Sequence, residues 1–202
     1  MRVAVDHREA ILEAAARLFG RRPYHEVLMD EVSDKVGVAK GTLYRYYATK
    51  EELFAAVSIF YIEKIGAELK AVGPHGANGS KSAQPLEILR ARLVRLILLL
   101  EEHKNFFQVM QRHELEIWTL KKTEFLKHRA RNRDLFATLI EAAQACGEVK
   151  LPFSAATISD MLFGMVRNSL RFSEPRVTPE RLADMALQIL IHGIGNHRGR
   201  KG

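Results

Sequence analysis

The stretch GVAKGTLYRYYATKEEL, residues 37–53, decides the fold of this chain. It follows the segment MDEVSDKV, residues 29–36, and contains a second short segment at residues 40–46; in both, apolar residues recur at helical spacing. The tripeptide between the two segments begins with Gly37, and a residue without a Cβ adopts a left-handed turn at the lowest cost. The two segments therefore predict a helix-turn-helix, in which a first helix holds a short second one at a fixed angle.

Seven positions have the residue types that this arrangement requires. Ser33 is small enough for the closest approach of the two helices, and Gly37 makes the turn. The remaining five are apolar and spaced to fill the angle between the helices: Val32, Val36, Val38, Leu43 and Tyr46.

The residues left pointing outward suit a DNA duplex. Lys40 and Lys50 can meet phosphates, and Gly41 lets the backbone approach closely at a helix N-terminus with free amides. Thr42, Tyr44 and Arg45 can reach base edges or the sugar-phosphate chain, and Arg45 can make a bidentate contact to guanine. Tyr46 and Tyr47 suit the core and a DNA contact equally well. The predicted DNA-binding set is Lys40, Gly41, Thr42, Tyr44, Arg45, Tyr46 and Lys50.

Helical periodicity extends along the rest of the chain, with no sustained strand alternation, and predicts an all-α fold of about nine helices. Residues 1–50 are expected to form a three-helix DNA-binding domain, followed by a linking helix at 49–72. Residues 51–202 are expected to form a larger helical domain for effector binding and dimerisation. The polar, glycine-containing segment at residues 73–85 predicts a loop.

Residues 8–55 resemble the tetracycline-repressor (TetR) family of bacterial transcriptional regulators. The resemblance rests on the run at 37–53 and on a first-helix pattern of Ile11, Ala14, Ala15, Leu18 and Phe19. It implies a homodimeric repressor that binds a palindromic double-stranded operator and is released by a small-molecule effector. The alternative is a DNA-binding activator or architectural factor without an effector, and a remote alternative is an enzyme.

The chain departs from the family pattern in two places. The family usually has Thr at the start of the second helix, where this chain has Val27, Leu28 and Met29. It usually has Ser before the Lys-Gly pair, where this chain has Ala39, so the recognition helix lacks a side-chain N-cap worth about 1 kcal/mol.

The resemblance also implies roles for the C-terminal residues. The last two helices of each subunit form the dimer interface in the family, and here they fall at about residues 154–172 and 178–196. The predicted interface residues are Met161, Leu162, Met165, Met185 and Ile189. The candidates for lining an effector pocket are Phe60, Phe106, Phe107, Met110, His113 and Trp118, which would equally suit a filled core. Their aromatic and apolar character predicts a small apolar or aromatic effector.

A basic run, KKTEFLKHRARNR at residues 121–133, has six Lys or Arg and one Glu. On a helix such a run is most often a solvated face. The other interpretation is an anionic effector such as a coenzyme A thioester.

The composition of the chain limits the classes of function that fit it. The net charge of +7 favours a polyanionic partner, although residues 1–50 contain nine Lys or Arg and seven acids, a surplus of only two. This modest surplus favours sequence-specific reading over nonspecific coating. A single cysteine, Cys146, and apolar runs of at most five residues predict a cytoplasmic protein without a membrane span. His113 and Glu114 begin a zinc-peptidase motif, but position 117 is Ile, so we predict no metal, no cofactor and no catalytic residue.

Overall fold

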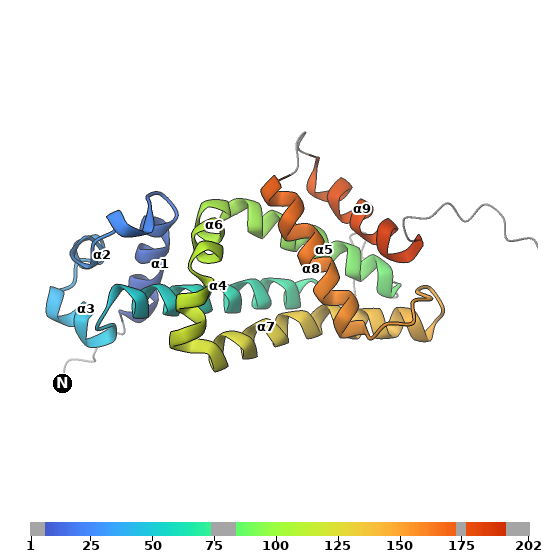
Figure 1. The fold of residues 1–202 in the computed structure, drawn as a ribbon, viewed down its shortest axis with the longest axis horizontal. Coiled ribbons are helices and arrows are strands. Elements are labelled where there is room, and N and C mark those ends of the chain that lie inside the picture. Colours follow the sequence, from blue (N-terminus) through green and yellow to red (C-terminus); the bar gives the residue numbers. More distant parts are fainter. Residues whose placement is uncertain (1–6, 74–83, 173–176, 193–202) are drawn as a thin grey trace, which may run out of the picture. The chain divides into compact units, whose positions relative to one another are not determined.

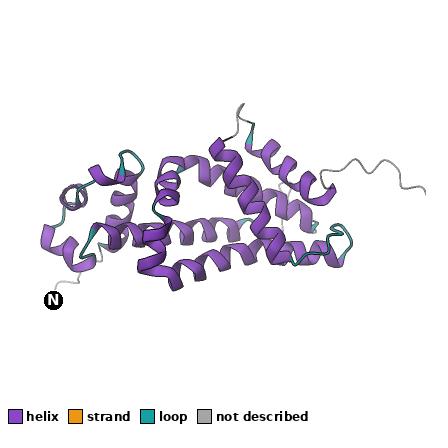
Figure 2. Cartoon of the chain, in the orientation of Figure 1, coloured by secondary structure: helices purple, strands orange, loops and turns teal. Residues whose placement is uncertain are grey.

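The computed structural model describes residues 7–73, 84–172 and 177–192, apart from the side chains of Glu116 and His192. Every regular element within these residues is helical (Figure 2), which confirms the predicted all-α fold. The N-terminal elements are α1 (Arg8–Phe19), the 3-10 turn η1 (Tyr24–Glu26), α2 (Met29–Val36), α3 (Lys40–Tyr46) and α4 (Lys50–Ala71). The others are α5 (Pro85–Glu102), α6 (Lys104–Arg112), α7 (Glu114–Ala145), α8 (Ala155–Phe172) and α9 (Pro179–His192) (Figure 1).

The chain divides into two compact units. Unit 1 comprises residues 1–65 and 102–129, and unit 2 comprises residues 66–101 and 130–202. Helices α4 and α7 contribute residues to both. Unit 1 therefore groups the helix-turn-helix with α6 and the first part of α7, while unit 2 contains α5, α8 and α9.

The helix-turn-helix in unit 1 has the predicted bounds. Gly37 has φ 76°, and its N–H donates to the Ser33 carbonyl at 2.9 Å, which closes α2. Val32, Ser33 and Leu43 are fully buried, so the predicted wedge between α2 and α3 is confirmed at these positions. Because these side chains are buried, the rotation of α3 about its axis is fixed, and with it the set of side chains that face away from α2.

The two tyrosines at the end of α3 are placed differently from each other. Tyr46, expected among the wedge residues, is 39% exposed, whereas Tyr47 is buried. The expectation that Tyr46 fills the angle is therefore wrong. Tyr47 follows the last residue of α3 with an extended backbone (φ −142°, ψ 110°), and it is this residue that turns into the core.

The middle helices are interrupted in two places. Helix α6 ends at Arg112 and α7 begins at Glu114, with His113 between them. A second interruption lies inside α7, where Lys121 has non-helical angles (φ −138°, ψ 31°). The predicted loop at 73–85 lies largely outside the described residues.

In unit 2, α8 and α9 pack side by side (Figure 1). Both begin after a hydroxyl cap: the Ser154 hydroxyl accepts from the Thr157 N–H at 3.1 Å, and the Thr178 hydroxyl accepts from the Arg181 N–H at 3.3 Å. No helix within the described ranges has the length and apolarity needed to cross a bilayer.

Candidate DNA-binding site

The outward face of α3 contains most of the residues predicted to contact DNA. Tyr44, Arg45 and Tyr46 are exposed, and Thr42 is half-buried. The Arg45 guanidinium donates to the Thr42 hydroxyl at 3.4 Å, so the two side chains lie together one helical turn apart. A Cβ built on Gly41 would meet nothing within 4 Å, and the backbone there is open to a close approach. The helix therefore presents polar and aromatic groups that can reach base edges.

The N-terminus of α3 has no side-chain cap. Ala39 has the extended backbone of an N-cap residue (φ −62°, ψ 142°), and its carbonyl accepts from the Thr42 N–H at 2.8 Å. The missing element is a hydroxyl that would accept from one of the first free amides. These amides stay available to a phosphate.

Substituting Ala39→Ser is expected to stabilise the protein by about 1 kcal/mol, because the backbone is already in the N-cap conformation. The measurement is the free energy of unfolding in urea. Ala48→Ser is the matched control, since Thr49 already caps α4 by accepting from the Glu52 N–H at 3.2 Å. An equal effect of the two substitutions would contradict the capping argument.

Lys40, at the first position of α3, is paired with α2. Its ammonium lies 2.6 Å from a carboxylate oxygen of Asp30, and both side chains are substantially exposed. This hydrogen bond, with the charge of Asp30, raises the pKa of Lys40. Lys40 therefore remains charged and on the surface, as a phosphate contact requires, but it has a partner within the protein.

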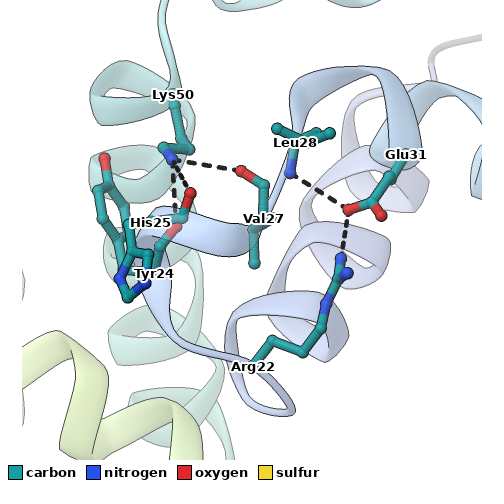
Figure 3. A network of polar contacts seen from close by, with 7 residues as sticks. All are labelled: Arg22, Tyr24, His25, Val27, Leu28, Glu31 and Lys50. Atoms are coloured by element: carbon teal, nitrogen blue, oxygen red, sulfur yellow. Dashed lines mark hydrogen bonds and ion pairs between the residues drawn. The ribbon is translucent and has the colours of Figure 1, made fainter.

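Lys50, at the start of α4, is directed into the protein's own backbone. Figure 3 shows its ammonium donating to the carbonyls of Tyr24, His25 and Val27, at 3.1, 3.4 and 3.2 Å. The ammonium also lies 4.6 Å from the centre of the Tyr24 ring. This half-buried lysine was expected to contact phosphate, but three carbonyls in η1 and directly after it already occupy its donors. Lys50 thus fastens the turn before α2 to α4.

Substituting Lys50→Met keeps the apolar stem and removes the three donors. We expect the free energy of unfolding to fall by about 1–2 kcal/mol, since the carbonyls remain partly accessible to water. Urea denaturation measures this loss. Lys70→Met, which alters an exposed lysine in the last turn of α4, should leave the stability within about 0.5 kcal/mol. Equal stabilities of the two variants would show that the contacts to the carbonyls contribute nothing.

The start of α2 has no side-chain hydroxyl cap, but a carboxylate binds the amide of its N-cap residue. Glu31 accepts from the Leu28 N–H at 3.2 Å and is paired with the guanidinium of Arg22 (Figure 3). The hydrogen bond from Arg22, followed by that from the Leu28 N–H, lowers the pKa of Glu31. The departure at Val27, Leu28 and Met29 therefore leaves the first amides inside α2 without a side-chain cap, and Leu28 itself is exposed.

Residues 11–57, which include this whole site, match the family model described as "Bacterial regulatory proteins, tetR family". The chain belongs to the TetR family. It is a DNA-binding transcriptional regulator with an N-terminal helix-turn-helix.

Similar proteins include the fatty acid metabolism regulator protein of Bacillus subtilis, 24% identical over 193 residues that cover 92% of this TetR-family chain and 94% of that protein. The HTH-type transcriptional activator FasR of Mycolicibacterium smegmatis is 37% identical over 60 residues, and the match spans only 27% of its length. Among solved structures, AibR in complex with isovaleryl coenzyme A and operator DNA is 26% identical, with a TM-score of 0.65 over 92% of this chain and 98% of that one.

Four of the six candidate pocket residues of this TetR-family chain join one aromatic cluster in unit 1. Phe106 and Phe107 are buried, with ring centroids 4.8 and 6.4 Å from that of Tyr61. The half-buried Phe60 lies against Tyr61 at 5.7 Å, and His113 against Phe54 at 5.7 Å. Met110 and Trp118 are half-buried and have no ring contact with the cluster among the interactions described, and Trp118 lies instead under Lys122.

The same cluster reaches the helix-turn-helix, which the sequence did not indicate. The His113 ring lies 4.3 Å from that of Tyr24, the residue whose carbonyl accepts from Lys50. Phe54 of α4 contacts both Tyr24 and Phe19 of α1, at 5.2 and 4.9 Å. Phe54 and Tyr61 are two helical turns apart on α4 and so lie on the same side of that helix. This spacing is the one feature of the sequence from which a shared aromatic cluster could have been predicted.

The predicted dimer face divides into exposed and buried positions. Met161, Met185 and Ile189 are 50%, 38% and 43% exposed, which is high for large apolar side chains, and Met165 is half-buried. Leu162 is only 1% exposed and lies in the core of the protomer, so it has almost no surface to offer a partner. It is the neighbour of Met161 in sequence and points in a different direction from α8, because adjacent residues on a helix differ by about 100° in direction.

Proposed function

We propose that this chain is a homodimeric repressor that reads a palindromic operator with α3 of each protomer and is released by a small-molecule effector. The observation that carries the proposal is the group formed by the exposed Tyr44 and Arg45 and the half-buried Thr42, on a helix that is anchored by the fully buried Leu43. Base reading requires this combination of a rigid support and free polar side chains. The proposed location is the cytoplasm, where the operator is.

The proposed DNA contacts have distinct tasks. Thr42, Tyr44 and Arg45 read base edges, whereas Lys40, Gly41 and the free amides of α3 meet phosphates. Tyr46, exposed at the end of α3, packs against the sugar-phosphate chain. Lys50 acts indirectly, by holding the turn that supports α2.

The proposed dimer forms through α8 and α9. Their exposed apolar side chains would be covered by the same face of a second copy, as in a two-fold interface. Dimerisation matters because one short helix reads few base pairs, whereas two readers about 34 Å apart engage successive major grooves.

The proposed effector is a small apolar or aromatic molecule bound among the middle helices. The contacts from His113 to Tyr24 and Phe54 give the start of α7 a direct route to the turn before α2. An alternative effector is an acyl coenzyme A, favoured by the isovaleryl coenzyme A in the AibR complex and by the basic run at 121–133. Titrating isovaleryl coenzyme A, free isovalerate and an aromatic acid against the protein–operator complex separates the two classes, since only the active class lowers the bound fraction.

The proposal is tested by selecting bound duplexes from a random DNA library at physiological salt and sequencing them. A palindromic consensus is the expected result. Enrichment of a non-palindromic motif would contradict the proposal that a two-fold dimer recognises the DNA. If no sequence is enriched although the protein binds DNA, an architectural DNA-binding function would replace the proposed repressor.

A further inference from the structure

A carboxylate lies beside the lysine at the entrance of the recognition helix. The Lys40 ammonium and the Asp30 carboxylate are 2.6 Å apart, with 60% and 45% of their side chains exposed. Asp30 lies in the first turn of α2, and its carbonyl accepts from the hydroxyl of the fully buried Ser33 at 2.7 Å. The carboxylate therefore projects from a well-fixed turn, and it sets where the ammonium of the longer, flexible lysine lies.

An acidic group at this place opposes the charge of the site. Phosphates repel a carboxylate, and an exposed ion pair contributes little to folding stability. Glu31, the other acid in the first turn of α2, is accounted for by its contacts with Arg22 and the Leu28 N–H. The charge of Asp30 favours the N-terminus of α2 wherever its exposed carboxylate points, so the helix does not require the contact with Lys40, and that contact calls for a functional explanation.

We propose that Asp30 is a specificity-determining residue, which holds the Lys40 ammonium in one position so that only a duplex docked in the operator register meets it. The proposal rests on the proposed function. Binding to arbitrary DNA consists of phosphate contacts made by side chains that adapt to many registers. A lysine tethered to Asp30 adapts poorly, and the nearby carboxylate repels misplaced phosphates. In the operator complex, base contacts fix the register, and one phosphate can then complete an Asp30–Lys40–phosphate chain.

Asp30→Asn tests the proposal, with two duplexes as probes: the consensus selected from the library and a duplex of random sequence. Affinity for the random duplex is expected to rise about fivefold at low salt, and affinity for the consensus less than about twofold. The slope of log affinity against log salt for the random duplex should steepen by about 0.9, the value for one added phosphate contact. Adding Lys40→Met to Asp30→Asn should reverse both changes.

Asp34→Asn is the matched control. Asp34 is an exposed acid on the same helix that acts on Lys40 only through its charge, so its removal changes the net charge equally without releasing the lysine. Its expected effect on either duplex is at most about twofold. Circular dichroism of all variants checks that the helices are retained.

Equal gains on both duplexes in Asp30→Asn, or equal effects of Asp30→Asn and Asp34→Asn, would overturn the role of Asp30. Either result would leave the DNA-binding function standing. Failure of the unsubstituted protein to prefer any duplex would instead reject the proposed function.

Discussion

Replacing Thr42, Tyr44 and Arg45 together by alanine is expected to lower the affinity for the selected operator by at least about 100-fold. Each base contact contributes about 1–3 kcal/mol of discrimination, and in the middle of α3 the side chains of Tyr44 and Arg45 are exposed and that of Thr42 is half-buried. The affinity for a random duplex should change by less than about tenfold, since Lys40 and the free amides of α3 still reach phosphates. Fluorescence anisotropy with both duplexes measures the two affinities.

The fold should survive this triple substitution, because Leu43, which anchors α3, is untouched and alanine favours a helix. The far-UV circular dichroism spectrum and the molecular mass in solution are therefore expected to match those of the unsubstituted protein. Thr119→Ala with Lys122→Ala, on the exposed surface of α7, is the matched control and should leave operator affinity unchanged. If the triple variant kept its sequence preference, the reading residues would lie outside α3.

Substituting Gly164→Trp, on α8, is expected to convert the proposed dimer to a monomer and to reduce operator affinity by at least about 100-fold, because each operator half would then be bound separately. A Cβ at this position would meet nothing within 4 Å, so the indole should fit outside the isolated protomer. It would occupy the space in which α8 of a second copy should lie. Replacing a helical glycine also favours the helix by up to about 1 kcal/mol, so protomer stability is not expected to fall.

A second pair of variants separates this effect from a general loss of solubility or folding. Met161→Asp introduces a charge on the proposed interface, and Leu98→Asp introduces the same charge at another exposed apolar position, on α5. Light scattering should show monomers for Met161→Asp and dimers for Leu98→Asp. Dimers in both Met161→Asp and Gly164→Trp would place the interface elsewhere.

The sequence alone determined the all-helical fold and the bounds of the helix-turn-helix. These features depend on local causes: apolar periodicity, the left-handed turn at Gly37, and the hydroxyl caps at Ser154 and Thr178. The local signal also identified α3 as the proposed reader, since a short helix between Ala39 and Tyr47 can turn only one side toward the protein.

Only the tertiary structure decided how individual side chains are used. Lys50 meets carbonyls from residues more than twenty positions earlier, and Lys40 meets Asp30 across the turn, because long flexible side chains take partners that the fold places near them. Tyr47 is buried in place of Tyr46 because the backbone leaves the helix there. Leu162 is buried while Met161 is exposed because packing against neighbouring helices sets the rotation of α8. Apolar periodicity marks a helix's apolar stripe, but the contacts made in three dimensions decide which side chains of that stripe are covered.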